Sequence, residues 1–171
     1  MLSKREPAPP IAIIGMGIRL PGGVSSAEQF WDLLVNKRDG RCRVPADRYN
    51  VDAFYSDKTH QQNTSTDHGY FLDTNIKGFD TSVFGVKRTE IGITDPQLRI
   101  LLEVVWECME NAGQTNMRGT DTGVFVGVFG EDWHNMLHKD TLMPNNYRVL
   151  SAGDYALANM LSWEFDLSGP R

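Results

Sequence analysis

Apolar side chains recur at every third or fourth position from Thr94 to Gly113, in TDPQLRILLEVVWECMENAG. This spacing gathers them on one side of a helix. Thr94 and Gln97 match a capping box, Pro96 suits the first turn, and Gly113 is a typical helix stop. We therefore predict a helix that is buried over most of its circumference. The narrow polar edge that remains comprises Arg99, Glu103, Glu107 and Glu110.

Apolar runs before and after this helix indicate strands. Asp121–Gly130, DTGVFVGVFG, is apolar almost throughout and predicts a strand covered on both faces. Ile11–Ile14 predicts a shorter strand that ends in a tight turn at Gly15 and Gly17. A third, short strand is predicted at Gly69–Leu72.

Three further segments show helical patterns. Residues 25–40, SSAEQFWDLLVNKRDG, begin with two serines that can cap a helix and end at a glycine. The side of this helix that we expect to be buried comprises Phe30, Trp31, Leu33 and Leu34. Residues 131–139 and 154–166 predict two more helices, whereas residues 41–67 lack periodicity and predict a long loop. The alternation of strands and helices predicts an α/β fold.

Composition narrows the possible functions mainly by exclusion. The 171 residues are enough for one domain with a core, and 40% apolar with 23% charged residues is ordinary for a globular protein. A net charge of −5 argues against a nucleic-acid or anionic-membrane surface. No apolar run is long enough to span a membrane, and the polar, proline-rich residues 1–10 contain no signal core. We expect an exposed leader at 1–10 and a cytoplasmic location.

Few residues in the sequence point to chemistry. Gly15 and Gly17 could begin a dinucleotide-binding fingerprint, but Leu20 occupies the position of the third glycine, so we expect no nucleotide site. His134 and His138 lie one helical turn apart. The segment has neither the glutamate of H-E-x-x-H nor an evident third ligand, so we expect no metal site.

The two cysteines, Cys42 and Cys108, lie far apart, and without an export signal we expect both to be reduced. Cys108 lies on the apolar side of the central helix and is interpreted as a small core residue. Cys42 lies between Arg41 and Arg43, which favours a reactive thiolate, but no histidine partner is suggested. From these patterns we predict no catalytic residue, cofactor site or metal site.

Ordered blocks along the chain resemble the β-ketoacyl synthase (ketosynthase) domain of polyketide synthases. They are IAIIGMGIRLPGG at 11–23, SAEQFWDLL at 26–34, VPADRYN at 44–50, GYFLDTNIKGFDTSVFG at 69–85, ITDPQLRILLEVVWECMENAG at 93–113, TGVFVGVFGEDW at 122–133 and YRVLSAGDYALANMLSWEFDLSGP at 147–170. The last two blocks are most similar to the highly reducing polyketide synthases of filamentous fungi. Several blocks in the right order are more specific than any single motif.

The resemblance implies a thiolase-like fold, in which two similar α/β halves stack into layers of helices and sheets. Residues 11–171 would be the N-terminal portion of this domain, an incomplete part of its first half. The implied reaction is a decarboxylative Claisen condensation of an acyl thioester with a malonyl thioester. The implied partners are a second copy of the synthase and a carrier protein that bears phosphopantetheine, while the domain itself holds no cofactor.

In the family, a nucleophilic cysteine in a D-T-A-C-S-S-like turn follows shortly after the GP of DLSGP, and two catalytic histidines lie in the second half. Here the sequence ends at Arg171. Neither Cys42 nor Cys108 matches the nucleophile, and none of the four histidines matches a catalytic one. We therefore expect the isolated chain to be inactive. Three alternatives stay open: a non-catalytic fragment that binds or regulates an intact ketosynthase, a truncated gene product, and an unrelated small α/β protein.

Overall fold

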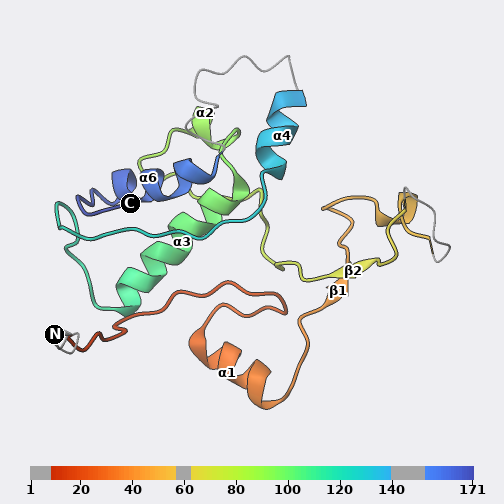
Figure 1. Cartoon of the computed structure of the whole chain (residues 1–171), viewed down its shortest axis with the longest axis horizontal. Coiled ribbons are helices and arrows are strands. Elements are labelled where there is room, and N and C mark those ends of the chain that lie inside the picture. Colours follow the sequence, from red (N-terminus) through yellow and green to blue (C-terminus); the bar gives the residue numbers. More distant parts are fainter. Residues whose placement is uncertain (1–8, 57–62, 140–152) are drawn as a thin grey trace, which may run out of the picture.

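The computed structural model describes residues 9–56, 63–139 and 153–171 (Figure 1). Helix α3, Pro96–Asn111, lies in the middle of the molecule, and helix α6, Asp154–Glu164, packs beside it. The hydrophobic core forms between these two helices and the chain on either side of them. Its buried members are Phe84, Val86, Leu98, Leu102, Leu157, Leu161, Phe165 and Leu167.

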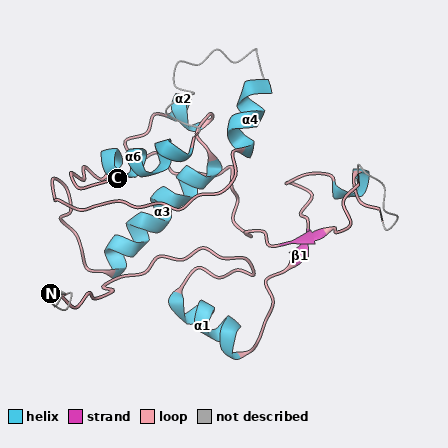
Figure 2. Cartoon of the chain, viewed as in Figure 1, coloured by secondary structure: helices cyan, strands magenta, loops and turns pink. Residues whose placement is uncertain are grey.

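Short elements surround this pair of helices (Figure 2). The helical ones are α1 (Ala27–Val35), the 3-10 helix η1 (Val51–Ala53), α2 (Arg88–Ile91) and α4 (Asp132–Lys139). Strand β1, Cys42–Arg43, pairs antiparallel with β2, His68–Gly69, so that Cys42 faces Gly69. The sequence predicted a loop at 41–67 and a strand at 69–72. The observed pairing takes Cys42 and Arg43 from the start of the predicted loop. Of the predicted strand, only Gly69 is paired.

The central helix forms as predicted, with a different first residue. Asp95 is the N-cap, and its Oδ1 accepts a hydrogen bond of 2.8 Å from the backbone N–H of Gln97. Thr94, predicted to be the cap, is instead buried and donates its hydroxyl to the carbonyl of Glu90 at 3.0 Å. At the other end Gly113 has a φ of 66°, the left-handed conformation that favours glycine after a helix.

Helix α1 also forms within its predicted range, but the prediction for its apolar side was wrong. Ser26 caps the helix by accepting a 3.3 Å hydrogen bond from the backbone of Gln29. No residue of α1 is buried, and the side chains of Trp31 and Leu34 are 67% and 52% exposed. Helical periodicity located the element correctly. Whether its apolar face is covered depends on neighbours that the periodicity does not specify.

The segment 121–130 is extended but is not a strand of a sheet, which corrects the prediction of a buried strand. Val124, Val126 and Val128 pack against the core, whereas the intervening Phe125 and Phe129 are 83% and 100% exposed. The segment is tied to the chain near Pro170 by one backbone bond, from the N–H of Val124 at 2.8 Å. A strand needs hydrogen-bond partners along its length, and among the described residues 125–130 have no such ladder.

The predictions of a strand at Ile11–Ile14 and of a tight turn after it were also wrong. Residues 11–19 run extended without a turn, and Ile11 is 95% exposed. Gly15 and Gly17 instead allow this segment to cross helix α3 closely. A Cβ atom at Gly15 would lie 2.7 Å from the carbonyl oxygen of Cys108, and one at Gly17 would lie 2.3 Å from that of Val104.

Two remaining predictions concern the start of the chain and membranes. Of the predicted exposed leader, Pro9 and Pro10 are exposed, and residues 1–8 lie outside the described residues. None of the helices in the described segments combines the length and the apolar character needed to cross a lipid bilayer.

Candidate functional site

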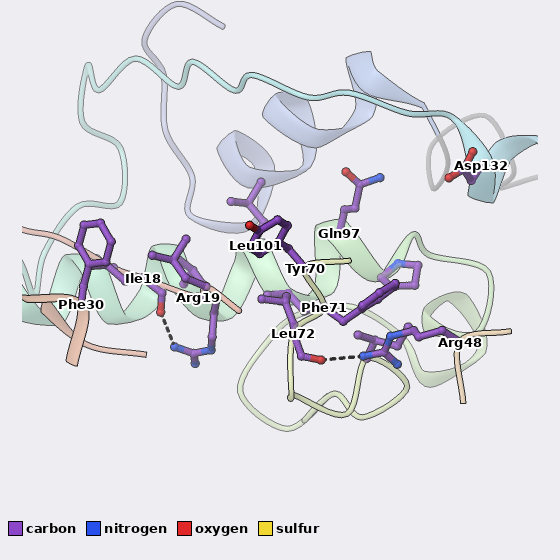
Figure 3. Close-up of a pocket in the computed structure, with 16 residues that line it drawn as sticks. Ile18, Arg19, Phe30, Arg48, Tyr70, Phe71, Leu72, Gln97, Leu101 and Asp132 are labelled. Atoms are coloured by element: carbon purple, nitrogen blue, oxygen red, sulfur yellow. Dashed lines mark hydrogen bonds between the residues drawn. The ribbon is translucent and has the colours of Figure 1, made fainter. Parts of the chain in front are cut away.

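An open groove of about 1030 Å³ runs along one side of α3 (Figure 3). Most of its wall comes from the extended segment at 17–20, the loop at 70–76 and the N-terminal half of α3. Phe30 of α1, Arg48 and Asp132 of α4 complete it. Most of the lining is apolar. The larger apolar side chains are Ile18, Leu20, Phe30, Tyr70, Phe71, Leu72, Ile76, Ile100, Leu101 and Val104.

Two arginines line this groove, and both have partners. Arg19 makes a two-pronged ion pair with Glu107 on α3, with N–O distances of 2.8 and 2.5 Å. The hydrogen bonds to this carboxylate raise the pKa of the Arg19 guanidinium above its ordinary value. Arg48 donates to the carbonyl of Leu72 at 2.9 Å and to the carboxylate of Asp47 at 2.7 Å. Both arginines therefore fasten backbone segments to the groove wall.

The groove holds no set of catalytic groups among its lining residues. It contains no cysteine, serine or histidine, and its remaining polar groups are the side chains of Gln97 and Asp132 and the hydroxyl of Tyr70. A nucleophile with an adjacent base is the usual signature of covalent catalysis. The geometry therefore provides a largely apolar surface whose two arginines are paired.

The cysteines and the α4 histidines that the sequence singled out lie apart from this groove, whereas Gly17 and Leu20 of the apparent dinucleotide fingerprint line it. Cys42 is on β1 and Cys108 is on α3; both are free and partly buried, so the interpretation of Cys108 as a core residue holds only in part. His134 and His138 meet on α4, where their Nε2 atoms are in hydrogen-bond contact. The described residues contain no group of three or more His, Cys, Asp or Glu arranged to hold a metal ion.

Arg99 was predicted to lie on the polar edge of the helix, and this was wrong. Its side chain is buried, 7% exposed, and its guanidinium carbon lies 5.9 Å from the centre of the Trp133 ring on α4. Its contact with the carbonyl of Lys77 is long, at 3.5 Å, and its Nε has no partner within the described part of the chain. Burial lowers the pKa of Arg99. Helical periodicity could not reveal this because α4 covers the residue from another part of the chain.

The capping carboxylate Asp95 shares this partly buried environment. Burial raises the pKa of the Asp95 carboxyl, and the hydrogen bonds from Gln97 and the charge of Arg99 oppose that shift. A raised pKa means that the folded state takes up this proton more readily than the unfolded state does. The resulting stability is complete below the unfolded pKa of about 3.9 and is lost as the pH rises through the higher folded pKa.

We expect Asp95→Ala to lower the free energy of unfolding by about 0.5–2 kcal/mol at pH 7, because the first turn of α3 loses its cap. Asp95→Asn keeps the acceptor oxygen and avoids burying a charge, so it should be at least as stable as the parent at pH 7, with the difference shrinking at pH 4. Urea unfolding at both pH values measures this. Asp121→Asn, at an exposed position, is the control. An Asp95→Asn variant as unstable as Asp95→Ala would contradict the assignment of Asp95 as the N-cap of α3.

Comparisons with known proteins identify the family to which almost the entire chain belongs. Residues 8–171 match the family model described as the β-ketoacyl synthase N-terminal domain. A highly reducing polyketide synthase of a Fusarium species is 55% identical over 162 residues, and one of Glarea lozoyensis is 50% identical over 163 residues. Each alignment covers 94% of this chain and 6% of the relative. The chain thus spans a small part of the length of these relatives.

Solved structures agree with this assignment. An oxazolomycin ketosynthase domain from Streptomyces albus superposes with a TM-score of 0.74 at 28% identity, covering 92% of this chain and 28% of that one. The ketosynthase of module 6 of the Bacillus subtilis bacillaene synthase also gives 0.74, at 26% identity, covering 93% of this chain and 25% of that one. The fold is therefore part of the thiolase-like ketosynthase fold, and the chain belongs to the β-ketoacyl synthase family as a portion of its N-terminal domain.

Proposed function

We propose that residues 11–171 form the N-terminal portion of a ketosynthase domain in a highly reducing polyketide synthase, acting in the cytoplasm. The observation that carries this proposal is the identity of about half of all aligned residues, along 94% of the chain, to synthases of that name. The share of identical residues also makes an unrelated α/β protein a poor explanation. Because the chain spans 6% of those relatives, the activity proposed is that of the longer synthase.

The reaction proposed for the parent synthase joins two thioesters. An acyl group is first transferred to a cysteine of the domain. A malonyl group on the phosphopantetheine arm of a carrier protein then loses CO₂, and the resulting enolate attacks the acyl carbonyl. The cysteine leaves as a thiolate, and the product is a β-ketoacyl thioester on the carrier protein. Covalent capture divides a difficult step into two easier ones. We further propose that the synthase acts as a homodimer.

In this proposal residues 11–171 supply structure and no nucleophile. Cys42 lies in the β1–β2 pair, where its backbone faces Gly69. Cys108 lies in the interior of α3, under the crossing at Gly17, where a Cβ atom would be 3.1 Å from that of Cys108. Neither cysteine lies at the start of a helix, one of the settings that activate a thiol. Cys42 does lie between Arg41 and Arg43, so the serine variant below tests it directly.

An exchange of segments tests the proposal. Residues 11–171 would replace the aligned segment of the Fusarium synthase, and the purified hybrid would be assayed for product by mass spectrometry. We expect the hybrid to make the product of the parent synthase. A second hybrid, carrying Cys42→Ser and Cys108→Ser, should retain acyl loading and product formation. A hybrid of native size that accepts no acyl group would overturn the proposed function, and loss of loading in the serine variant alone would overturn the structural role of the cysteines.

A further inference from the structure

Helix α4 carries two histidines whose rings meet on the surface. His134 and His138 lie one turn apart, with ring centroids 4.3 Å from each other and their Nε2 atoms in contact. Residues four apart on a helix share a face, but this spacing alone does not direct the same ring nitrogen of both to one point. Here both Nε2 atoms occupy the same small region of space. The arrangement is a property of the side-chain conformations, and the sequence spacing alone did not establish it.

The chemistry of this pair suits a metal ion. A neutral imidazole nitrogen is a good ligand for zinc, copper and nickel, with metal–nitrogen distances of about 2.0–2.1 Å for zinc. Two neutral rings can share one hydrogen bond through their Nε2 atoms only if one of these nitrogens carries the proton. A divalent ion that binds both lone pairs replaces this single bond by two ligand bonds. We expect side-chain rotations of His134, which is partly exposed, and His138, which is exposed, to make room for the ion.

The surroundings of the pair favour a cation. His134 also lines a small cavity of about 10 Å³, space for about one water molecule, together with three carboxylate side chains. These carboxylates are those of Asp95, Glu131 and Asp154. Two cations oppose them: Lys139, in the last turn of the same helix, and Arg99, whose charge acts on Asp95. The acidic rim, in a chain with a net charge of −5, raises the local concentration of divalent cations.

We propose that His134 and His138 form a binding site for a late first-row divalent transition metal, with water in the remaining coordination positions. The sequence argued against a metal site because no third protein ligand was evident, and no third ligand group is found among the described residues. The proposed site requires only two protein ligands, because water fills the remaining coordination positions. Copper should bind more tightly than nickel or zinc, following the usual order of affinity for nitrogen ligands. This site is independent of the proposed condensation activity.

Titration of Cu²⁺ into the metal-free 171-residue chain tests the proposal, with calorimetry for affinity and electron paramagnetic resonance for the ligands. We expect one copper ion with two equatorial nitrogens from histidine. His134→Gln and His138→Gln should each weaken binding by about 100-fold, because the second nitrogen binds as part of an intramolecular chelate. His68→Gln, on β2, is the matched control and should leave the affinity unchanged.

A second variant separates geometry from histidine content. His138→Gln combined with Lys139→His keeps the number of histidines but places the pair five residues apart, off a common helix face. We expect this double variant to bind as weakly as His138→Gln alone. Circular dichroism should show unchanged helix content in all variants, since the substituted side chains are at least partly exposed. Undiminished binding in the double variant, or equal weakening by His68→Gln, would overturn the proposal.

Discussion

Replacing Leu102 with alanine is expected to lower the free energy of unfolding by about 2–5 kcal/mol. Leu102 is 1% exposed and lies on α3 in the cluster that joins this helix to α6. Its removal leaves a cavity between two helices that are held in place by their other buried residues, so the site cannot collapse fully. Urea unfolding of the purified chain, followed by circular dichroism, measures the loss.

A matched pair of variants tests the cause of that loss. Leu34→Ala removes the same atoms from α1, where the side chain is 52% exposed, and should change the stability by less than about 0.5 kcal/mol. Leu102→Met nearly conserves volume and should cost less than about 1.5 kcal/mol. If Leu102→Ala were as mild as Leu34→Ala, the contact between α3 and α6 would not be the core of the folded chain.

Gly17→Ala is expected to destabilise the chain by about 1–3 kcal/mol or more. The added Cβ atom would lie 2.3 Å from the carbonyl oxygen of Val104. That oxygen belongs to the backbone of α3 and cannot move aside by a side-chain rotation, so the extended segment must lift away from the helix. The displacement would also strain the neighbouring ion pair between Arg19 and Glu107, which fastens the same segment.

The control for this prediction is another glycine in extended chain. A Cβ atom at Gly127 would meet no atom within 4 Å, so Gly127→Ala should be close to neutral. Unfolding midpoints would be compared for the two variants, followed by the fluorescence of the four tryptophans, one of which, Trp106, lies on α3. Equal stability of the two variants would mean that the crossing of residues 15–17 over α3 is looser than the structure describes.

The crossing also explains why the glycines invited a wrong interpretation. In the sequence, Gly15 and Gly17 indicate either a nucleotide-binding turn or a tight turn after a strand. Both glycines are required for a third reason, the close approach of one backbone to a helix about 90 residues further along. A local pattern shows that a side chain is excluded. It does not show what excludes it.

The buried electrostatics at the start of α3 were likewise invisible in the sequence. In the sequence pattern Arg99 belongs to the polar edge of the central helix, but in the structure the ring of Trp133 on α4 lies against it. Trp133 is itself fixed by a hydrogen bond of 2.8 Å from its Nε1 to the carbonyl of Ile93. The place of Trp133 in a short amphipathic helix suggests a packed aromatic residue, but its partners Ile93 and Arg99 lie about 34 to 40 positions earlier in the chain.

Local signals in the sequence located the four longer helices and identified the family, but they did not predict the short helices η1 and α2. Helical hydrogen bonds run between residues four apart, so periodicity, caps and stop signals within one window suffice to locate α1, α3, α4 and α6. Ordered motifs along the whole chain sufficed for the ketosynthase family. The tertiary structure decided what packs on what: the exposure of α1, the burial of Arg99, and the lack of strand pairing at 125–130 among the described residues. Strand pairing and burial depend on partners distant in the chain, and a local pattern carries no information about where those partners lie.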